Sequence, residues 1–186
     1  MDAGSIKIEF FVKVFDVITK RLLEGDDENG YLPKRLGMSS RKNFEVLALV
    51  IYHAFVQGGV FFGRFQKWIF TYLVDPDDAD LLKCLIEVKH IPKNAGTAPL
   101  LSFIDDLNTA ESNQEIFVLC EKAENSERIN SSQWDIWDSV TMENKNSLIQ
   151  ELIYDEVVRT RTIEFNYQRV SFLWILRCYQ KAPKYY

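Results

Sequence analysis

The chain has 186 residues, of which 47% are hydrophobic and 13% aromatic, and its formal net charge is −5. This apolar content excludes wholesale disorder, and the acidic balance disfavours a globally basic nucleic-acid-binding protein. The length suits one core of ordinary size, so we expect a single globular domain over residues 1–186.

The N-terminal part of the sequence predicts one strand, one loop and one helix. Apolar and charged residues alternate over residues 5–15, which predicts a strand, and the polar stretch 24–33 predicts a turn or an exposed loop. Over residues 41–56 the apolar positions follow helical spacing, which predicts a helix. The aromatic-rich stretch 60–74 fits either a strand or a helix.

The middle of the chain is predicted to mix helices with a strand. Asp75 is the expected N-cap of a helix with Pro76 at its first position, because carboxylates suit the positive end of a helix dipole. Further along, we expect a short helix that starts at Thr97 or Ala98 and contains residues 100–107, and a strand over residues 114–121. The polar stretch 123–132 is expected to be an exposed connection.

The last third predicts two helices followed by two strands. Residues 133–140 suggest a short aromatic helix, and residues 147–158 have the apolar spacing of an amphipathic helix. Residues 160–168 alternate and residues 170–180 follow them, which together predict a terminal pair of strands. The expected fold class is therefore α+β, a single domain with a mainly antiparallel sheet covered by helices.

The sequence contains no group of residues that indicates catalysis. His53 and His90 are the two histidines, too few for a nucleophilic triad to be argued. Cys84 and His90 lack further metal ligands at short spacing, and the carboxylates near Asp75 are explained by helix stabilisation. We therefore expect a protein that is not an enzyme, with no catalytic residue, no metal and no cofactor.

The cysteines and the hydropathy indicate a reduced, intracellular setting. Cys84, Cys120 and Cys178 are widely spaced and form no CxxC pair. The N-terminal segment is not of signal-peptide type, and no stretch approaches 18 consecutive apolar residues. No membrane span is expected, and peripheral contact with a membrane stays compatible with the sequence.

Basic residues occur in pairs, one of which opens the helix predicted at residue 41. Cations in a first helical turn cost roughly 0.3–1 kcal/mol, a cost that any solvated surface tolerates. An anionic partner would offset it and would also meet the free N–H groups of the turn. On this second interpretation, the candidate partner-binding residues are Lys34, Arg35, Arg41, Lys42, Arg159 and Arg161.

The stretch from Gly37 to Ala48 resembles a segment of rhabdovirus matrix proteins of the vesicular stomatitis type. It contains Gly-Met, two small residues, two bases, one intervening residue, a Phe and then Leu-Ala. The order of predicted elements is similar as well, from the aromatic-rich first strand to the Trp-Asp pair, the amphipathic helix and the terminal strands. The sequence shows neither a basic N-terminal arm nor a Pro-Pro-x-Tyr motif, which favours a short form like those of plant rhabdoviruses.

This resemblance implies a viral matrix-like structural protein that self-associates, condenses the ribonucleoprotein and links it to the inner face of the membrane. The implied partners are a second copy of the chain, the viral nucleoprotein–RNA complex and an anionic membrane surface, with no small-molecule substrate. The implied location is the virion and the host cytoplasm, peripheral to membranes.

A different class of function is the alternative. Gly63-Arg64 resembles the Gly-Arg pair that opens a central apolar helix in the Bcl-2 family, although Phe61 and Phe62 stand where that family has Asn-Trp. This resemblance implies a helical adaptor or apoptosis regulator that binds a partner helix. A predominance of helix with almost no strand would favour it over the matrix-like function.

Overall fold

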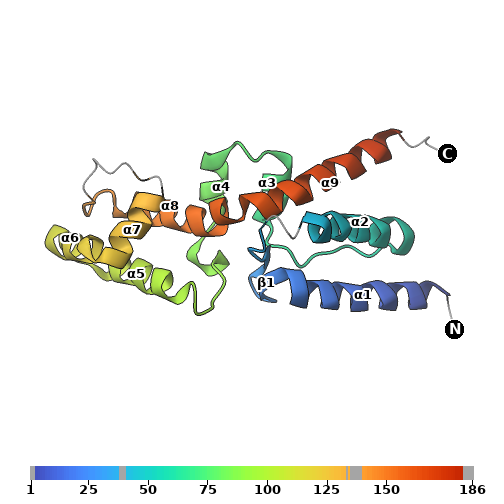
Figure 1. Ribbon diagram of the computed structural model, residues 1–186, viewed down its shortest axis with the longest axis horizontal. Helices are drawn as coiled ribbons and strands as arrows, with labels where there is room; N and C mark the ends of the chain where they lie inside the picture. Colours follow the sequence, from blue (N-terminus) through green and yellow to red (C-terminus); the bar gives the residue numbers. More distant parts are fainter. Residues whose placement is uncertain (1–2, 38–40, 133, 135–139, 182–186) are drawn as a thin grey trace. The chain divides into compact units, whose positions relative to one another are not determined.

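The computed structural model describes residues 3–37, 41–132, 134 and 140–181, and these residues are mostly helical (Figure 1). Contacts divide the chain into two compact units. The first unit consists of Met1–Asp77 with Arg161–Tyr186, and the second consists of Asp78–Thr160. Along the chain, the second unit is thus inserted into the first. The single domain expected over the whole chain stays a prediction, and each unit is described by itself.

Helices and one short hairpin make up the first unit. Its elements are α1 (Ala3–Leu22), β1 (Leu23–Asp26), β2 (Gly30–Pro33), α2 (Arg41–Gly58), α3 (Trp68–Val74) and α9 (Thr162–Lys181). The long helices α1, α2 and α9 lie side by side with α2 in the middle (Figure 1). The shorter α3 packs against α9.

Aromatic side chains form much of the core of the first unit. Phe15 of α1 meets the fully buried Phe62 edge-on, with 4.8 Å between ring centroids. On the other side, Trp68 and Tyr72 of α3 pack against Phe165 of α9 at centroid distances of 5.6 and 4.8 Å. Such ring pairs add to the stabilisation that burial itself provides.

The hairpin closes where the sequence predicted only a loop over residues 24–33. Its strands pair antiparallel, with Asp26 opposite Gly30, and the Asp26 carboxylate accepts the Asn29 N–H at 2.7 Å. Gly25 has a φ of 135°, and a Cβ at this position would lie 2.4 Å from the Gly30 carbonyl oxygen. Only glycine therefore fits position 25.

All the regular elements described in the second unit are helical. Its elements are α4 (Ala79–Leu85), η2 (Val88–His90), α5 (Ala98–Thr109), α6 (Asn113–Glu121), α7 (Ala123–Ser131) and α8 (Lys145–Val157). The 3-10 turn η3 (Arg159–Arg161) leads from α8 to α9. Helix α8 packs against α4, α5 and α7. The apolar side chains that α8 buries are Leu148, Ile149, Leu152, Ile153 and Val157.

The predicted α+β fold is wrong, because the segments assigned to its sheet are helical. The predicted strand at residues 5–15 is part of α1, the strand at 114–121 lies in α6, and residues 162–180 lie in α9. In α1 the buried residues are Phe11, Phe15 and Thr19, which follow one another at intervals of four positions as helical spacing requires. Within the described residues, β pairing is confined to the hairpin and one isolated bridge.

The predictions of the other helices had mixed outcomes. Helices predicted over 41–56, 100–107 and 147–158 are confirmed as α2, α5 and α8. The helix after Asp75 exists as α4, but its N-cap is Asp78, whose carboxylate accepts the backbone N–H of the third helical residue at 3.0 Å.

Two predictions concern the segment between α6 and α8. The polar stretch 123–132, predicted as a connection, is largely the helix α7. The aromatic helix predicted over 133–140 falls mostly on residues outside those that the structure describes.

Candidate functional site

Two side chains of α9 hold the basic segments of the first unit at the start of that helix. The Glu164 carboxylate, only 2% exposed, accepts the backbone N–H groups of Leu36 and Gly37 at 2.9 and 2.7 Å. The Arg41 guanidinium lies 5.7 Å from the centre of the Tyr167 ring. Glu164 and Tyr167 are three residues apart, about 4.5 Å along the helix axis. The chain after the hairpin and the start of α2 therefore converge on one end of α9.

We call the four cations on these converging segments the basic end: Lys34, Arg35, Arg41 and Lys42. Arg35 and Lys42 are exposed, and the Lys34 ammonium donates to the Lys20 carbonyl at 2.7 Å. Arg41 pairs with the Glu45 carboxylate at 2.7 Å, and this hydrogen bond raises the pKa of the guanidinium. The pairing also shows how α2 tolerates cations in its first turn, where no acidic residue occurs.

Arg161, the last of the six candidate residues, has no exposed side-chain surface. Its Nε donates to the Pro33 carbonyl at 3.1 Å, and its Nη2 donates to the Glu24 carboxylate at 2.8 Å. These bonds fasten Arg161, the first residue of the C-terminal part of the first unit, to both strands of the hairpin. A guanidinium enclosed in this way stabilises the fold and offers no contact to a partner.

Arg159 lies in the second unit, within a network that α8 organises. Its guanidinium pairs with the carboxylates of Glu151 and Asp155, and it lies 5.1 Å from the centre of the Tyr154 ring. Lys83 of α4 pairs with the same Glu151 at 2.6 Å and lies 5.4 Å from the same ring. The structure thus gathers four of the six candidates at the basic end and places the other two in internal ion pairs.

The two units carry opposite formal charges. The ranges of the first unit contain fifteen Lys and Arg against eleven Asp and Glu, a balance of +4. The second unit contains seven Lys and Arg against sixteen Asp and Glu, a balance of −9. Together they give the net charge of −5. The order of residues along the sequence hides this division, because the basic unit is built from both ends of the chain.

Helix α2 presents a row of largely apolar residues on the side opposite its buried face, which we call the outer stripe. Its members follow one another at intervals of four, three, four and three residues: Lys42, Val46, Leu49, His53 and Val56. Val46, Leu49 and Val56 are 56%, 38% and 52% exposed. Spacing of this kind is typical of a helix seam that packs against a partner. The sequence pattern predicted only the buried face of this helix.

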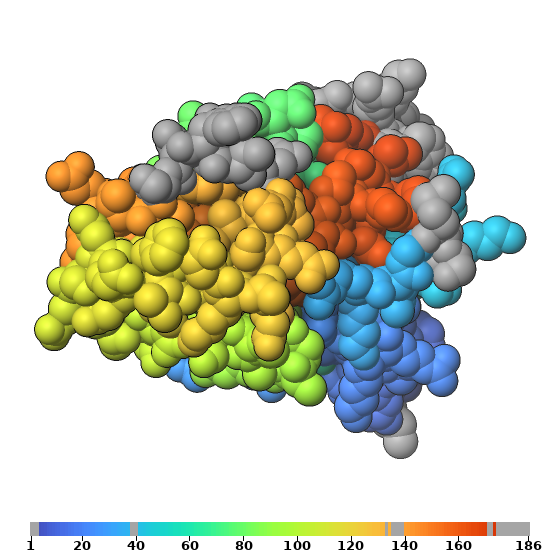
Figure 2. Space-filling model, turned by 60° about the vertical axis from the view of Figure 1, so that its left-hand side comes forward, coloured from blue at the N-terminus to red at the C-terminus, as the bar shows by residue number. Residues whose placement is uncertain are grey.

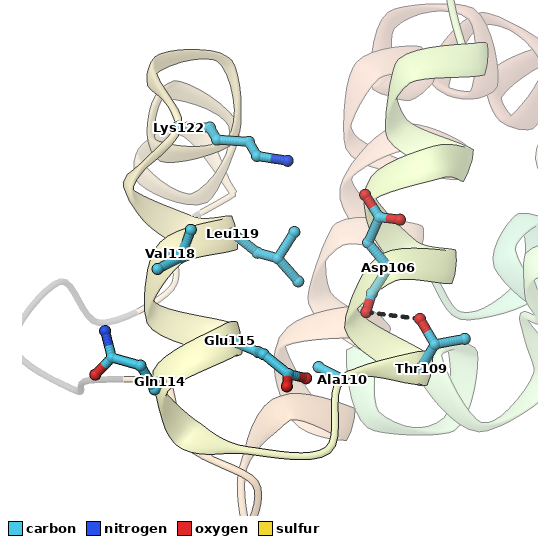
Figure 3. A pocket seen from close by; sticks show the side chains of 8 residues that line it. All are labelled: Asp106, Thr109, Ala110, Gln114, Glu115, Val118, Leu119 and Lys122. Atoms are coloured by element: carbon cyan, nitrogen blue, oxygen red, sulfur yellow. Dashed lines mark hydrogen bonds between the residues drawn. The ribbon is translucent and has the colours of Figure 1, made fainter.

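An open groove runs between α5 and α6, and we call it the acidic groove (Figure 3). Its lining combines apolar and charged side chains, among them Asp106, Ala110, Glu115, Val118, Leu119 and Lys122. Helices α5, α6 and α7 share a continuous surface (Figure 2), and residues 98–131 contain seven acidic and two basic residues. No signal in the sequence suggested this groove, because α6 was taken for a strand.

The structure gives no support for metal chemistry at Cys84 and His90. Within the described ranges, no three His, Cys, Asp or Glu side chains gather closely enough to hold a metal ion. His90 accepts the Glu87 N–H through Nδ1 at 2.9 Å, and burial lowers its pKa. Among the helices that the structure describes, none combines the length and the apolar character needed to cross a membrane.

Comparisons of the chain with protein-family models, with curated protein sequences and with solved structures give no match. The resemblance to rhabdovirus matrix proteins stays with the residues from Gly37 to Ala48, because the strands expected from it are helices. The basic end, the outer stripe and the acidic groove are therefore the features that bear on the function of this protein.

Proposed function

We propose that this protein is a structural protein that acts by surface contact, binding an anionic partner at the basic end and self-associating through exposed apolar side chains. The observation that carries the proposal is the convergence of Lys34, Arg35, Arg41 and Lys42 at one end of α9, on a unit whose formal charge is +4. Clustered cations on a firm scaffold attract phosphate-bearing surfaces, and salt weakens that attraction.

The anchoring of the basic end supports a binding role. The buried Glu164 fixes the segment after the hairpin through two backbone N–H groups, and Tyr167 supports the guanidinium of Arg41. Cations that the fold already holds in place lose less conformational freedom on binding than cations on a loose tail.

The partners that we propose are those of a viral matrix-like protein. The protein would condense a nucleoprotein–RNA complex and link it to the anionic inner face of a membrane, in the virion and at membranes of the host cytoplasm. This choice of partners rests on the resemblance from Gly37 to Ala48, which includes Arg41 and Lys42 of the basic end. An anionic lipid surface and RNA-bound nucleoprotein share the phosphate chemistry that such cations recognise.

Charge reversal at the basic end tests the proposal. In Arg41→Glu/Lys42→Glu we expect about 30-fold weaker binding to phosphatidylserine-containing vesicles and to nucleoprotein–RNA, because each cation near an anionic surface contributes about 1 kcal/mol. The melting temperature should barely change, since both side chains are exposed. Lys7→Glu/Lys67→Glu, the same charge change at exposed positions outside the basic end, is the matched control. Undiminished binding of the first variant at low salt would remove the basic end from the proposal.

The helical adaptor of the Bcl-2 type is the second candidate, favoured by the helical fold of the described residues. The Gly-Arg pair does not open a long central helix, as it does in that family. Gly63-Arg64 precedes α3, a helix of only seven residues, about 10 Å long. Arg64 pairs with Asp16 and donates to Thr19, so it holds α1 to this segment. Tight binding of an amphipathic helical peptide, unaffected by charge reversal at the basic end, would favour the adaptor.

A further inference from the structure

We propose that the outer stripe of α2 in one copy docks into the acidic groove of a second copy, so that the protein associates head to tail. The inference rests on the proposed function, because it names the surfaces through which the proposed self-association occurs. It requires no group beyond those that the chain itself presents.

The outer stripe has the spacing and the exposure of side chains that are typical of a helix that binds in a groove. Val46, Leu49 and Val56 lie on one side of α2, and all three are exposed although they are apolar. Lys42 is the first residue on the same side of the helix, and Arg41 precedes it in the sequence. Helices that dock in grooves present anchors at this spacing, with charged residues beside them.

The acidic groove offers the complementary chemistry. Figure 3 shows Leu119 and Glu115 of α6 pointing towards α5, from which Asp106 projects. Leu119 and Val118 supply apolar surface, and the two carboxylates supply negative charge beside it. Lys122 adds one cation at an end of the groove, but acidic residues prevail over residues 98–131 by seven to two.

Charge decides which pairing of surfaces is favoured. A symmetric contact between two α2 stripes would bring together two units of formal charge +4, and a contact between two grooves would bring together two units of −9. Only the head-to-tail pairing joins opposite charges, which favours association and suppresses the symmetric alternatives. Each pair of copies then retains one unused stripe and one unused groove, so the contact continues from copy to copy, into an open chain or a closed ring.

Sedimentation velocity of the full chain over a range of concentrations tests this arrangement. We expect the wild type to form oligomers that grow with concentration and dissociate at high salt. The stripe variant Lys42→Glu/Val46→Glu and the groove variant Asp106→Lys/Glu115→Lys should each sediment as a monomer where the wild type associates. A one-to-one mixture of the two variants should associate again, because each reversed surface then faces its complement.

Matched controls separate the contact from general charge effects. Glu124→Lys/Glu127→Lys changes the charge of the second unit as much as the groove variant does, at exposed positions on α7 outside the groove, and should associate like the wild type. The groove variant leaves the basic end intact, so its binding to anionic vesicles should persist. Far-UV circular dichroism of each variant reports whether it folds.

A capping experiment remains decisive even if the groove variant does not fold. The stripe variant keeps its groove, so added to the wild type it should occupy chain ends and reduce the mean oligomer size. A symmetric α2–α2 contact predicts no such reduction, and it also predicts that the groove variant associates normally.

The possible results separate the head-to-tail contact from self-association in general. A wild type that stays monomeric at every concentration contradicts both. If either variant forms oligomers as the wild type does, or if the mixture of the two variants fails to associate, the head-to-tail contact is wrong. Self-association by another surface is then still possible.

Discussion

The two units differ in where they put their charges and what they leave exposed. The first has an aromatic core, a balance of +4 and an apolar stripe open on α2. The second packs aliphatic side chains of α8 at its centre, carries a balance of −9 and keeps its ion-pair network next to that helix. The overall charge of −5 describes neither unit. The first unit is therefore suited to an anionic partner and the second to a cationic one.

Each unit also contains an arginine that pairs with a carboxylate, and the two arginines differ in burial. Arg161 of the first unit is completely enclosed and joins a helix end to a hairpin. Arg159 of the second unit keeps about a quarter of its side chain exposed and shares the Glu151 carboxylate with Lys83. The enclosed pair should therefore matter much more to stability than the shared one.

Breaking the enclosed pair should have the largest effect. In Arg161→Met the carboxylate of Glu24 and the Pro33 carbonyl lose their donor, and we expect a loss of about 3–5 kcal/mol in the free energy of unfolding. Urea denaturation measures this loss. Adding Glu24→Leu should restore part of it, because the carboxylate that lost the Arg161 guanidinium is then removed as well. A single variant as stable as the wild type would show that Arg161 does not hold the hairpin.

The sequence predicted a helix correctly where its apolar residues fit helical spacing and not a two-residue alternation. Helix α5 was recognised because Leu100, Phe103, Ile104 and Leu107 follow helical spacing. Helix α1 was not, because its apolar residues satisfy a two-residue period as well as the four-residue interval between Phe11 and Phe15. Burial then decided in favour of the helix.

The same ambiguity affected α9 and the candidate site. Glu164 and Arg161 are polar residues with buried side chains, so the sequence placed no core there and suggested strands and a surface arginine instead. Arg41 and Lys42 were recognised because they stand together at a helix start. The convergence of the basic segments on α9 could not be predicted, since it depends on contacts about 125 residues apart in sequence.

Removing the shared carboxylate of the second unit should have a moderate effect. Glu151→Gln keeps the shape of the side chain but leaves Lys83 and Arg159 without their common anion, so we expect a loss of about 2 kcal/mol. Thermal unfolding followed by circular dichroism measures it. Glu9→Gln, which breaks an exposed pair with Lys13 in the first unit, should leave the unfolding curve unchanged. If both substitutions lowered the stability equally, the partly buried pairs of Glu151 would contribute no more to stability than the exposed pair of Glu9.

The smallest effect should come from Asp155, and it should depend on pH. Burial raises the pKa of this carboxyl, against the lowering influence of Arg159. The folded protein therefore holds the proton more tightly than the unfolded chain, whose value lies near 3.8. Folding carries no penalty from this group below the unfolded value, and a penalty develops as pH rises through the raised folded value.

Asp155→Asn removes that titration. The variant should be slightly more stable than the wild type at pH 7, and the difference should shrink as the pH falls towards 3.8. Melting temperatures of both proteins across this range measure the difference. A variant that is less stable at pH 7 would mean that the pairing with Arg159 outweighs the burial of the carboxylate, and the network of the second unit would then resemble the enclosed pair of the first more closely than their exposures suggest.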